Sequence, residues 1–330
     1  MAPPQPPETA RRGRGRLRPV LAGIGTFLLA VGLFLRFYAV PRLVVWPTNV
    51  YQTDTLVAHN ASYFNEGTLT SRSGATLNYT VTLRGDPAAS NGQTAVWDEF
   101  SALADPKHQV IVQSTYQRAA FDRRTGELRN CCGAALNDNT RLRVSGIGIP
   151  WPIGTKKTTY RVFDTNTGRS WPATYAGQQR NEGVLTYRFV QHIPATLVQQ
   201  MPGVPASLLG LSGGSLVANR YYQAEVTYWV DPRTGVLIDQ QEKGLSYLHG
   251  PTGRGYLTVA DFNLRMTDAS RRALAAEANK NAAQLTLIRL TAPVGGVVLG
   301  LILILLAAIP FSRYRTLRGR RLIRPARRSP

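Results

Sequence analysis

The hydrophobic pattern divides the chain into two long apolar runs and a stretch of alternating positions between them. The first run covers residues 19–40 with Arg36 as its only charge, and the second covers residues 290–311 with none. A helix of about 20 apolar residues, rising about 1.5 Å per residue, crosses the roughly 30 Å hydrocarbon core of a bilayer. We therefore expect two transmembrane helices. No A-x-A cleavage pattern follows the first run, which favours an uncleaved anchor over a signal peptide.

Between the runs the dominant period is two, the pattern of half-buried β-strands. In residues 76–84, Leu77, Tyr79, Val81 and Leu83 share one face, and the other face is polar. Seven further segments repeat this alternation: 109–116, 119–122, 157–163, 183–191, 220–230, 235–242 and 255–266. Strands with one polar face are typical of antiparallel sheets. We predict a mainly β fold, in which an antiparallel β-rich extracytoplasmic domain over residues 43–266 is flanked by two transmembrane α-helices. The strands lack a regular outward apolar belt, which favours a water-soluble β domain over a membrane-spanning barrel.

A five-residue motif, D-x-x-T-G, occurs three times, at Asp122–Gly126, Asp164–Gly168 and Asp231–Gly235. The Asp side chain caps a turn, and the Gly accepts the positive φ that turns the chain back antiparallel. We expect Asp122, Gly126, Asp164, Gly168, Asp231 and Gly235 to form hairpin turns. The unequal spacing indicates convergent hairpin chemistry, and one such loop offers too few oxygen ligands for calcium.

After Met266 the pattern becomes helical. Residues 267–284 contain strong helix formers, a cap at Thr267 or Asp268, and neither Gly nor Pro. We predict a helical stalk over residues 267–289 that continues into the second apolar run.

The charge distribution gives the expected topology. The chain has 39 Lys and Arg against 19 Asp and Glu, a formal net charge of +20. Residues 1–18 contain five arginines and one acid, and residues 312–330 contain eight arginines and none. Because Lys and Arg close to a span stay on the cytoplasmic side, both tails should be cytoplasmic and residues of about 43–289 outside the plasma membrane. Basic tails beside a bilayer point to membrane lipid as a partner and away from nucleic acid.

Few residues suggest chemistry. Cys131 and Cys132 are adjacent and the only cysteines, so a strained disulfide between them, a link between chains and a plain structural turn remain open. The four histidines are isolated and show no zinc spacing. A G-x-S-x-G match at Ser212 lacks the strand–turn–helix context of a nucleophile elbow. We expect no enzyme, no catalytic residue, no metal and no cofactor.

The second apolar run contains a G-x-x-x-G pair, Gly296 and Gly300. Such a pair allows close approach of another helix. Pairing with Ala22, Gly25 and Gly32 of the first run is favoured, because the chain already holds the two runs together. A homo-oligomer formed through Gly296 and Gly300 is the alternative.

Several segments resemble one known family. The stretch from Pro150-Trp151-Pro152 to Tyr160, then Tyr187-Arg188-Phe189, the Pro202–Gly210 region and Tyr228–Gly235 are similar to the actinobacterial PorA-type porin family. The resemblance covers essentially the whole chain and includes the two-span layout. It implies a porin, and it brings no catalytic or binding residues.

Three hypotheses of function follow. The first is a non-enzymatic envelope protein that binds or passes an apolar or lipidic ligand, suggested by the layout and the many aromatic residues on the strands. The second is an assembly partner that docks envelope proteins on an exposed strand edge. The third is the porin or channel that the resemblance implies.

Overall fold

The structure is a computed structural model that describes residues 17–309. The predicted basic tails lie outside the described residues except for Leu17 and Arg18. The described chain falls into two units, one made of residues 17–40 and 288–309 and the other of residues 41–287.

Two apolar helices make up the first unit. Helix α1 (Leu17–Phe34) continues through a π-helical turn, Leu35–Ala39, into α2 (Val40–Leu43). A second π-helical turn, Leu287–Thr291, leads into α4 (Ala292–Ala308). The helical stretches Arg18–Ala39 and Asp268–Ala308, with mean hydropathies of 2.1 and 2.5, are both long and apolar enough to cross a membrane.

Glycines let α1 and α4 pack backbone to backbone. A methyl group added at Gly300 would lie 2.7 Å from the Gly25 carbonyl oxygen, and one at Gly32 would lie 2.9 Å from that of Pro293. One at Gly296 would lie 3.4 Å from the Gly32 Cα. The face of α4 that carries Gly296 and Gly300 is therefore covered by α1 of the same chain. At the π-helical turns, Arg36 donates a hydrogen bond to the Arg289 carbonyl (3.4 Å).

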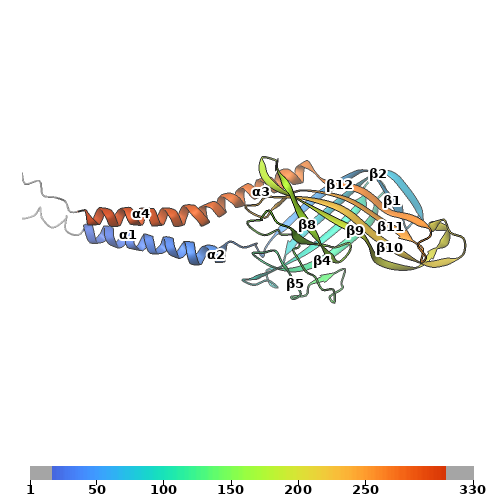
Figure 1. Cartoon of the computed structure of the whole chain (residues 1–330), viewed down its shortest axis with the longest axis horizontal. Coiled ribbons are helices and arrows are strands. Elements are labelled where there is room, and N and C mark those ends of the chain that lie inside the picture. Colours follow the sequence, from blue (N-terminus) through green and yellow to red (C-terminus); the bar gives the residue numbers. More distant parts are fainter. Residues whose placement is uncertain (1–16, 310–330) are drawn as a thin grey trace, which may run out of the picture. The chain divides into compact units, whose positions relative to one another are not determined.

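The second unit is built on one antiparallel sheet, which confirms the prediction of a mainly β, antiparallel fold (Figure 1). The strands run β5-β4-β3-β2-β1-β12-β11-β10-β9-β8-β7 across the sheet, and β6 pairs with β4. Their bounds are β1 Tyr51–Asn65, β2 Thr70–Gly85, β3 Thr94–Asp105, β4 Val110–Asp122, β5 Leu128–Arg129, β6 Ala135–Leu136, β7 Tyr160–Asp164, β8 Arg169–Asn181, β9 Val184–Pro205, β10 Ser215–Val230, β11 Leu237–His249 and β12 Tyr256–Met266.

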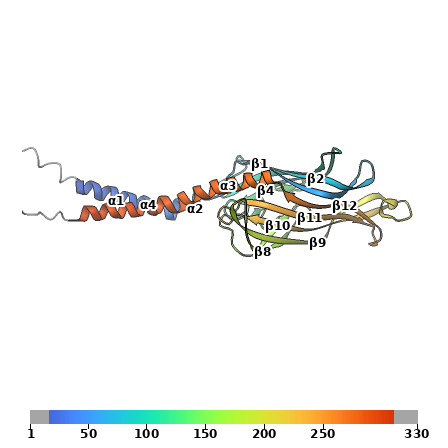
Figure 2. The same cartoon turned by 90° about the horizontal axis from the view of Figure 1, so that it is seen from above.

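The strands curl round rather than lying flat (Figure 2). Residues 146–148 bridge the two end segments of the sheet. Ile147 pairs with Glu127 beside β5 and with Val162 of β7. Main-chain hydrogen bonds of 2.8 Å from Leu128 N to Gly146 O and from Ile147 N to Arg161 O hold this bridge. The curled sheet therefore has an inner and an outer face.

Every predicted strand segment lies mostly within a strand, and 109–116 and 119–122 are parts of a single strand, β4. Five strands were not predicted: β1, β3, β8 and the two-residue strands β5 and β6. In β1 a bulge at Asn60 (φ 58°) shifts the register between Ala58 and Ala61, so the period of two breaks. Strand β9 also runs on past Pro194 and Pro202, where shifts in its pairing with β10 accommodate residues without an N–H donor.

A third helix, α3 (Asp268–Thr286), follows β12. Thr267 caps it by accepting a hydrogen bond from Ser270 N. Leu274, Ala275 and Ala278 are buried in the same apolar cluster as Leu56 and Leu264 of the sheet. The predicted stalk segment thus begins as a helix packed against the β unit.

The segment that carries the Pro150-Trp151-Pro152 motif lies across two of the hairpin turns. A methyl group at Gly126 would contact the Pro150 carbonyl, and one at Gly235 would contact the Trp151 carbonyl. Trp151 is 1% exposed and packs on Phe189, with ring centroids 4.6 Å apart. The motif therefore packs against the turns at Gly126 and Gly235 and against Phe189 of β9.

Candidate functional site

The three D-x-x-T-G segments share one turn geometry. In each, the Gly N–H donates to the carbonyl of the Asp, with distances of 2.9 Å at Gly126, 2.9 Å at Gly168 and 2.8 Å at Gly235. These glycines have φ of 70°, 63° and 79°. Each Asp Oδ1 also accepts main-chain N–H donors inside its own turn. Each Asp side chain therefore already accepts a hydrogen bond from the main chain of its own turn.

Cys131 and Cys132 are exposed free thiols in the tight turn between β5 and β6, which both pair with β4. Cys132 (φ 60°) and Gly133 (φ 77°) occupy left-handed positions, and Ala134 N donates to Cys131 O. Burial and the neighbouring Cys132 raise the pKa of the Cys131 thiol.

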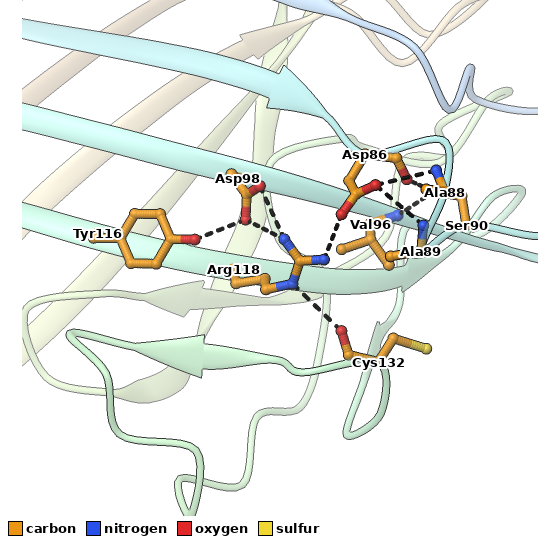
Figure 3. A network of polar contacts seen from close by, with 9 residues as sticks. All are labelled: Asp86, Ala88, Ala89, Ser90, Val96, Asp98, Tyr116, Arg118 and Cys132. Carbon is orange, nitrogen blue, oxygen red and sulfur yellow. Dashed lines mark hydrogen bonds and ion pairs between the residues drawn. The ribbon is translucent and has the colours of Figure 1, made fainter.

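Arg118 ties this turn to the sheet (Figure 3). Its guanidinium donates to both Asp98 oxygens (2.8 and 2.9 Å), to Asp86 (2.6 Å) and to the Cys132 carbonyl (3.4 Å). The hydrogen bond from Arg118 is the main cause that lowers the pKa of Asp86. Because both carboxylates are already paired with Arg118, this network is structural.

The inner face of the curled sheet carries a group of ionisable residues that the sequence did not single out. Glu99 on β3 lies opposite the buried Leu83, and Glu242 on β11 lies opposite the buried Val226. We call the following set the interior acid–tyrosine cluster: Tyr79, Glu99, Asp164, Tyr222, Tyr228 and Glu242. Its members come from β2, β3, β7, β10 and β11 and influence one another electrostatically.

Burial controls the acids of this cluster. It raises the pKa of Glu99 to about 7 and, opposing a hydrogen bond from Tyr222, that of Glu242 to about 7. Burial also raises the pKa of Asp164 against the hydrogen bonds of its turn. The physical cause is the cost of removing a carboxylate from water. Glu99 and Glu242 therefore change charge close to neutral pH.

The tyrosines surround these acids. Tyr222 donates to Glu242 Oε1 (2.6 Å), and Tyr228 donates to Gln191 Oε1 (2.8 Å). Burial and then the charges of Glu99 and Glu242 raise the pKa of Tyr79. The tyrosines thus remain neutral hydrogen-bonding groups at physiological pH.

A chain of polar side chains continues the cluster across the interior. Arg220 on β10 donates to Ser246 (3.0 Å) and to Gln113 on β4 (3.3 Å), which in turn donates to Asn166 (2.6 Å) beside Asp164. These contacts connect β4, on one side of the β1–β12 pair in the strand order, with β10, on the other side. In the part of the chain that the structure describes, no three His, Cys, Asp or Glu residues are grouped as a metal site.

The cluster was not predicted because its members are scattered over five strands. Asp98 and Glu99 are adjacent in β3 and therefore point to opposite faces of the strand: Asp98 pairs with Arg118, while Glu99 is buried. The sequence did contain one signal. Glu99 lies two residues after the apolar Trp97 and Glu242 lies four residues after the apolar Ile238, so each acid falls on the same strand face as an apolar residue. An acid on the buried face of a strand is costly and calls for an explanation.

A curled antiparallel sheet with a few buried acids among apolar core residues, in a chain with two helices long and apolar enough to cross a bilayer, is the class of structure that the described residues define. A family model for "Porin PorA" matches residues 18–309, so the chain belongs to the porin PorA family.

Two curated relatives carry the same name. "Porin PorA" of Corynebacterium resistens is 23% identical over 197 residues, which cover 42% of this chain and 47% of the relative. "Porin PorA" of Corynebacterium amycolatum is 24% identical over 123 residues, which cover 30% of this chain and 32% of the relative. The chain thus spans less than half the length of these relatives.

Proposed function

We propose that this chain is a non-enzymatic, membrane-anchored porin-family protein that passes small polar solutes, cations before anions, along the interior of its β unit. The observation that carries the proposal is the placement of Glu99 and Glu242 on the inner face of the curled sheet. The family name and the porin names of the relatives support the same function.

The electrostatics favour cations. A charge in a poorly hydrated interior acts more strongly than one in water. The Tyr222 hydroxyl donates to Glu242 and the Tyr228 hydroxyl donates to Gln191, so neutral polar groups lie around the acids. Because the pKa of both Glu99 and Glu242 is about 7, the interior becomes more negative as the pH rises through neutrality.

The other two hypotheses gain less from the structure. An apolar or lipidic ligand needs a carbon lining, whereas the interior acid–tyrosine cluster presents carboxylates and hydroxyls. Docking of an envelope protein by strand addition needs a free edge, and residues 146–148 already bridge the two ends of the strand order.

We place the two helices across the plasma membrane, both tails in the cytoplasm and the β unit outside. The outer side chains of β10 and β11 support a water-facing β unit, since they include Glu225 and Lys243 (3.1 Å apart). Packing of Gly296 and Gly300 against α1 supports a helix pair within one chain. The native thiols at positions 131 and 132 test the topology, because a membrane-impermeant maleimide should label them in intact cells. Labelling only after lysis would refute it.

Conductance tests the function. Purified full-length protein in planar bilayers should form channels whose cation selectivity increases between pH 5.5 and 8.5, a window of about 1.5 on either side of the pKa of Glu242. Glu242→Gln should weaken that pH dependence, while the matched outer-face variant Glu225→Gln should keep it. Absence of channels, or pH-independent selectivity in the wild-type protein, would overturn the proposal.

A further inference from the structure

An apolar patch lies on the outer face of β3 and β4. Phe100 is 52% exposed, Ile111 is 68% exposed and Tyr116 is 37% exposed. Phe100 and Tyr116 are direct cross-strand partners, and Ile111 lies opposite Ala104 further along the same two strands. Glu99, the residue before Phe100, is buried, so the Phe100 ring points away from the interior. We call Phe100, Ile111 and Tyr116 the outer apolar patch.

The outer apolar patch is neutral on its own strands and electrically balanced at one end. The outward strand positions between and beside its members carry small neutral side chains: Thr80 and Thr82 on β2, Ala102 and Ala104 on β3, and Ser114 on β4. At the end of the patch beyond Phe100 and Tyr116, Arg118 pairs with Asp98 and Asp86, and Arg84 lies opposite Asp98. Two arginines and two aspartates compensate one another, so a second copy of this surface would meet no excess of like charge.

The turn that carries the two cysteines contacts the same end of the patch (Figure 3). The Tyr116 hydroxyl donates to Asp98 (2.9 Å), and Arg118 donates to Asp98 as well. Arg118 also donates to the Cys132 carbonyl (3.4 Å). The thiols and the outer apolar patch are therefore connected through one polar network.

A disulfide within the cysteine pair conflicts with this turn. Consecutive Cα atoms are about 3.8 Å apart, whereas disulfides usually join Cα atoms about 4.4–6.8 Å apart. A ring between Cys131 and Cys132 would need the main chain to rearrange, and Ala134 N already donates to Cys131 O (3.0 Å). Asn130 and Val144 exchange two further hydrogen bonds beside the turn, of 2.9 and 2.8 Å. Since the sequence contains no third cysteine, an unstrained partner for either sulfur belongs to another molecule.

Cys132 is the better placed of the two sulfurs. It has φ 60° and occupies the first of two left-handed corner positions, followed by Gly133 with φ 77°, whereas Cys131 precedes the corner. Burial is the main cause that raises the pKa of the Cys131 thiol, so Cys131 forms a reactive thiolate less readily than an ordinary cysteine.

We infer that two copies of this chain associate through the outer apolar patch and are joined by a disulfide between their Cys132 residues. A two-fold axis places the same patch and the same sulfur on both sides, so one surface is its own partner. Three partly exposed side chains offer less area than the about 800 Å² per partner of a stable interface. The covalent bond compensates for this, because it makes the contact between the patches intramolecular.

The bond forms by thiol–disulfide exchange with a disulfide donor, R–S–S–R. The Cys132 thiolate of one copy attacks a donor sulfur, which forms a mixed disulfide and releases one R–SH. The partner's Cys132 thiolate then attacks the protein sulfur of that mixed disulfide and releases the second R–SH. The two protein thiols lose two electrons and two protons, and the donor takes up both. In the cell, this step rests on the proposed location of the β unit outside the cytoplasm, where disulfides persist.

The test uses purified full-length protein in detergent, incubated with oxidised glutathione and examined by non-reducing electrophoresis and intact-mass analysis. The wild-type protein should form a species with the mass of two chains, which dithiothreitol converts to single chains. Cys132→Ser should lose this species, whereas the matched control Cys131→Ser should keep it. Phe100→Lys should lower its yield about tenfold, equivalent to about 1.4 kcal/mol, and should carry glutathione on Cys132 instead.

Leu197→Lys is the control for the patch, because Leu197 is a 44% exposed residue of β9, away from β3 and β4. It should dimerise like the wild-type protein. The inference is overturned if the wild-type protein acquires only glutathione or an internal disulfide, or if Cys131→Ser loses the dimer as Cys132→Ser does. It is also overturned if Phe100→Lys, with unchanged thermal unfolding, dimerises fully, or if Leu197→Lys loses the dimer equally. Since the oxidant is added to purified protein, neither channel activity nor location enters the test, and it is separable from the proposed function.

Discussion

Replacing Glu99 by Gln should stabilise the protein increasingly as the pH rises from 4.5 to 7, and by a constant amount above pH 7. The side chain is 8% exposed, and burial raises its pKa from the usual 4.5 to about 7. In the unfolded chain Glu99 ionises above pH 4.5, whereas in the folded chain it stays protonated up to about pH 7. The folded state therefore binds more protons in this window, and its stability falls as the pH rises.

The magnitude follows from the size of the pKa change. Since one pKa unit corresponds to about 1.4 kcal/mol, ionisation of Glu99 should remove about 3 kcal/mol of stability between pH 4.5 and 7 and no more above it. Glu99→Gln cannot ionise. The free energy of unfolding of the variant, relative to the wild-type protein, should therefore increase by about 3 kcal/mol over this range.

Urea unfolding followed by tryptophan fluorescence, at intervals from pH 4.5 to 8.5, measures this difference. The matched control is Glu225→Gln, whose carboxylate is 41% exposed and paired with Lys243 at 3.1 Å. For an exposed pair the difference should stay within about 1 kcal/mol at every pH. If the Glu99→Gln difference does not grow with pH while the control stays flat, Glu99 is not buried as described and the reasoning fails.

Three further substitutions test packing and turns. Gly300→Val should lower the thermal stability of the α1–α4 pair in detergent, because its side chain meets the Gly25 carbonyl, whereas Gly295→Val, with nothing within 4 Å, should not; equal effects would contradict the pairing. Gly235→Ala should cost more in urea unfolding than Gly253→Ala, since both have positive φ but only Gly235 meets the Trp151 carbonyl; equal costs would exclude that contact. Asp231→Asn should cost about 2 kcal/mol in the same assay, because a fully buried carboxylate that accepts from Arg233 and Thr234 loses its charge; no loss would argue against this capping.

Local patterns predicted the strands well, because period-two alternation depends only on neighbouring residues and burial of one face. The segment 220–230 illustrates this, as its Tyr222, Val226 and Val230 are buried together. The pattern failed in β1, where the bulge at Asn60 reverses the parity, and in β9, where prolines are tolerated at shifts of register.

The interior acid–tyrosine cluster and the bridge at residues 146–148 depend on which strands become neighbours. Glu99 and Glu242 lie 143 positions apart in the sequence, and no local signal connects them. Ile147 sits in a loop without strand character, yet it pairs with both ends of the strand order. Contacts of this kind follow from topology, which one sequence does not reveal.

The strand order also has a consequence for how the chain assembles. Strands β2 to β5 pair with sequence neighbours, as do β7 to β11, so the two arms of the sheet can form locally. The long-range step is the seam between β1 and β12, where Leu56 meets Met266. Closing a loop of about 210 residues is entropically costly, by an amount that grows with the logarithm of loop length. The apolar helices are attached beyond the two seam strands, and once paired they raise the effective concentration of β1 and β12 for each other. The paired helices should therefore speed the pairing of β1 with β12, and the β unit expressed without them should fold more slowly.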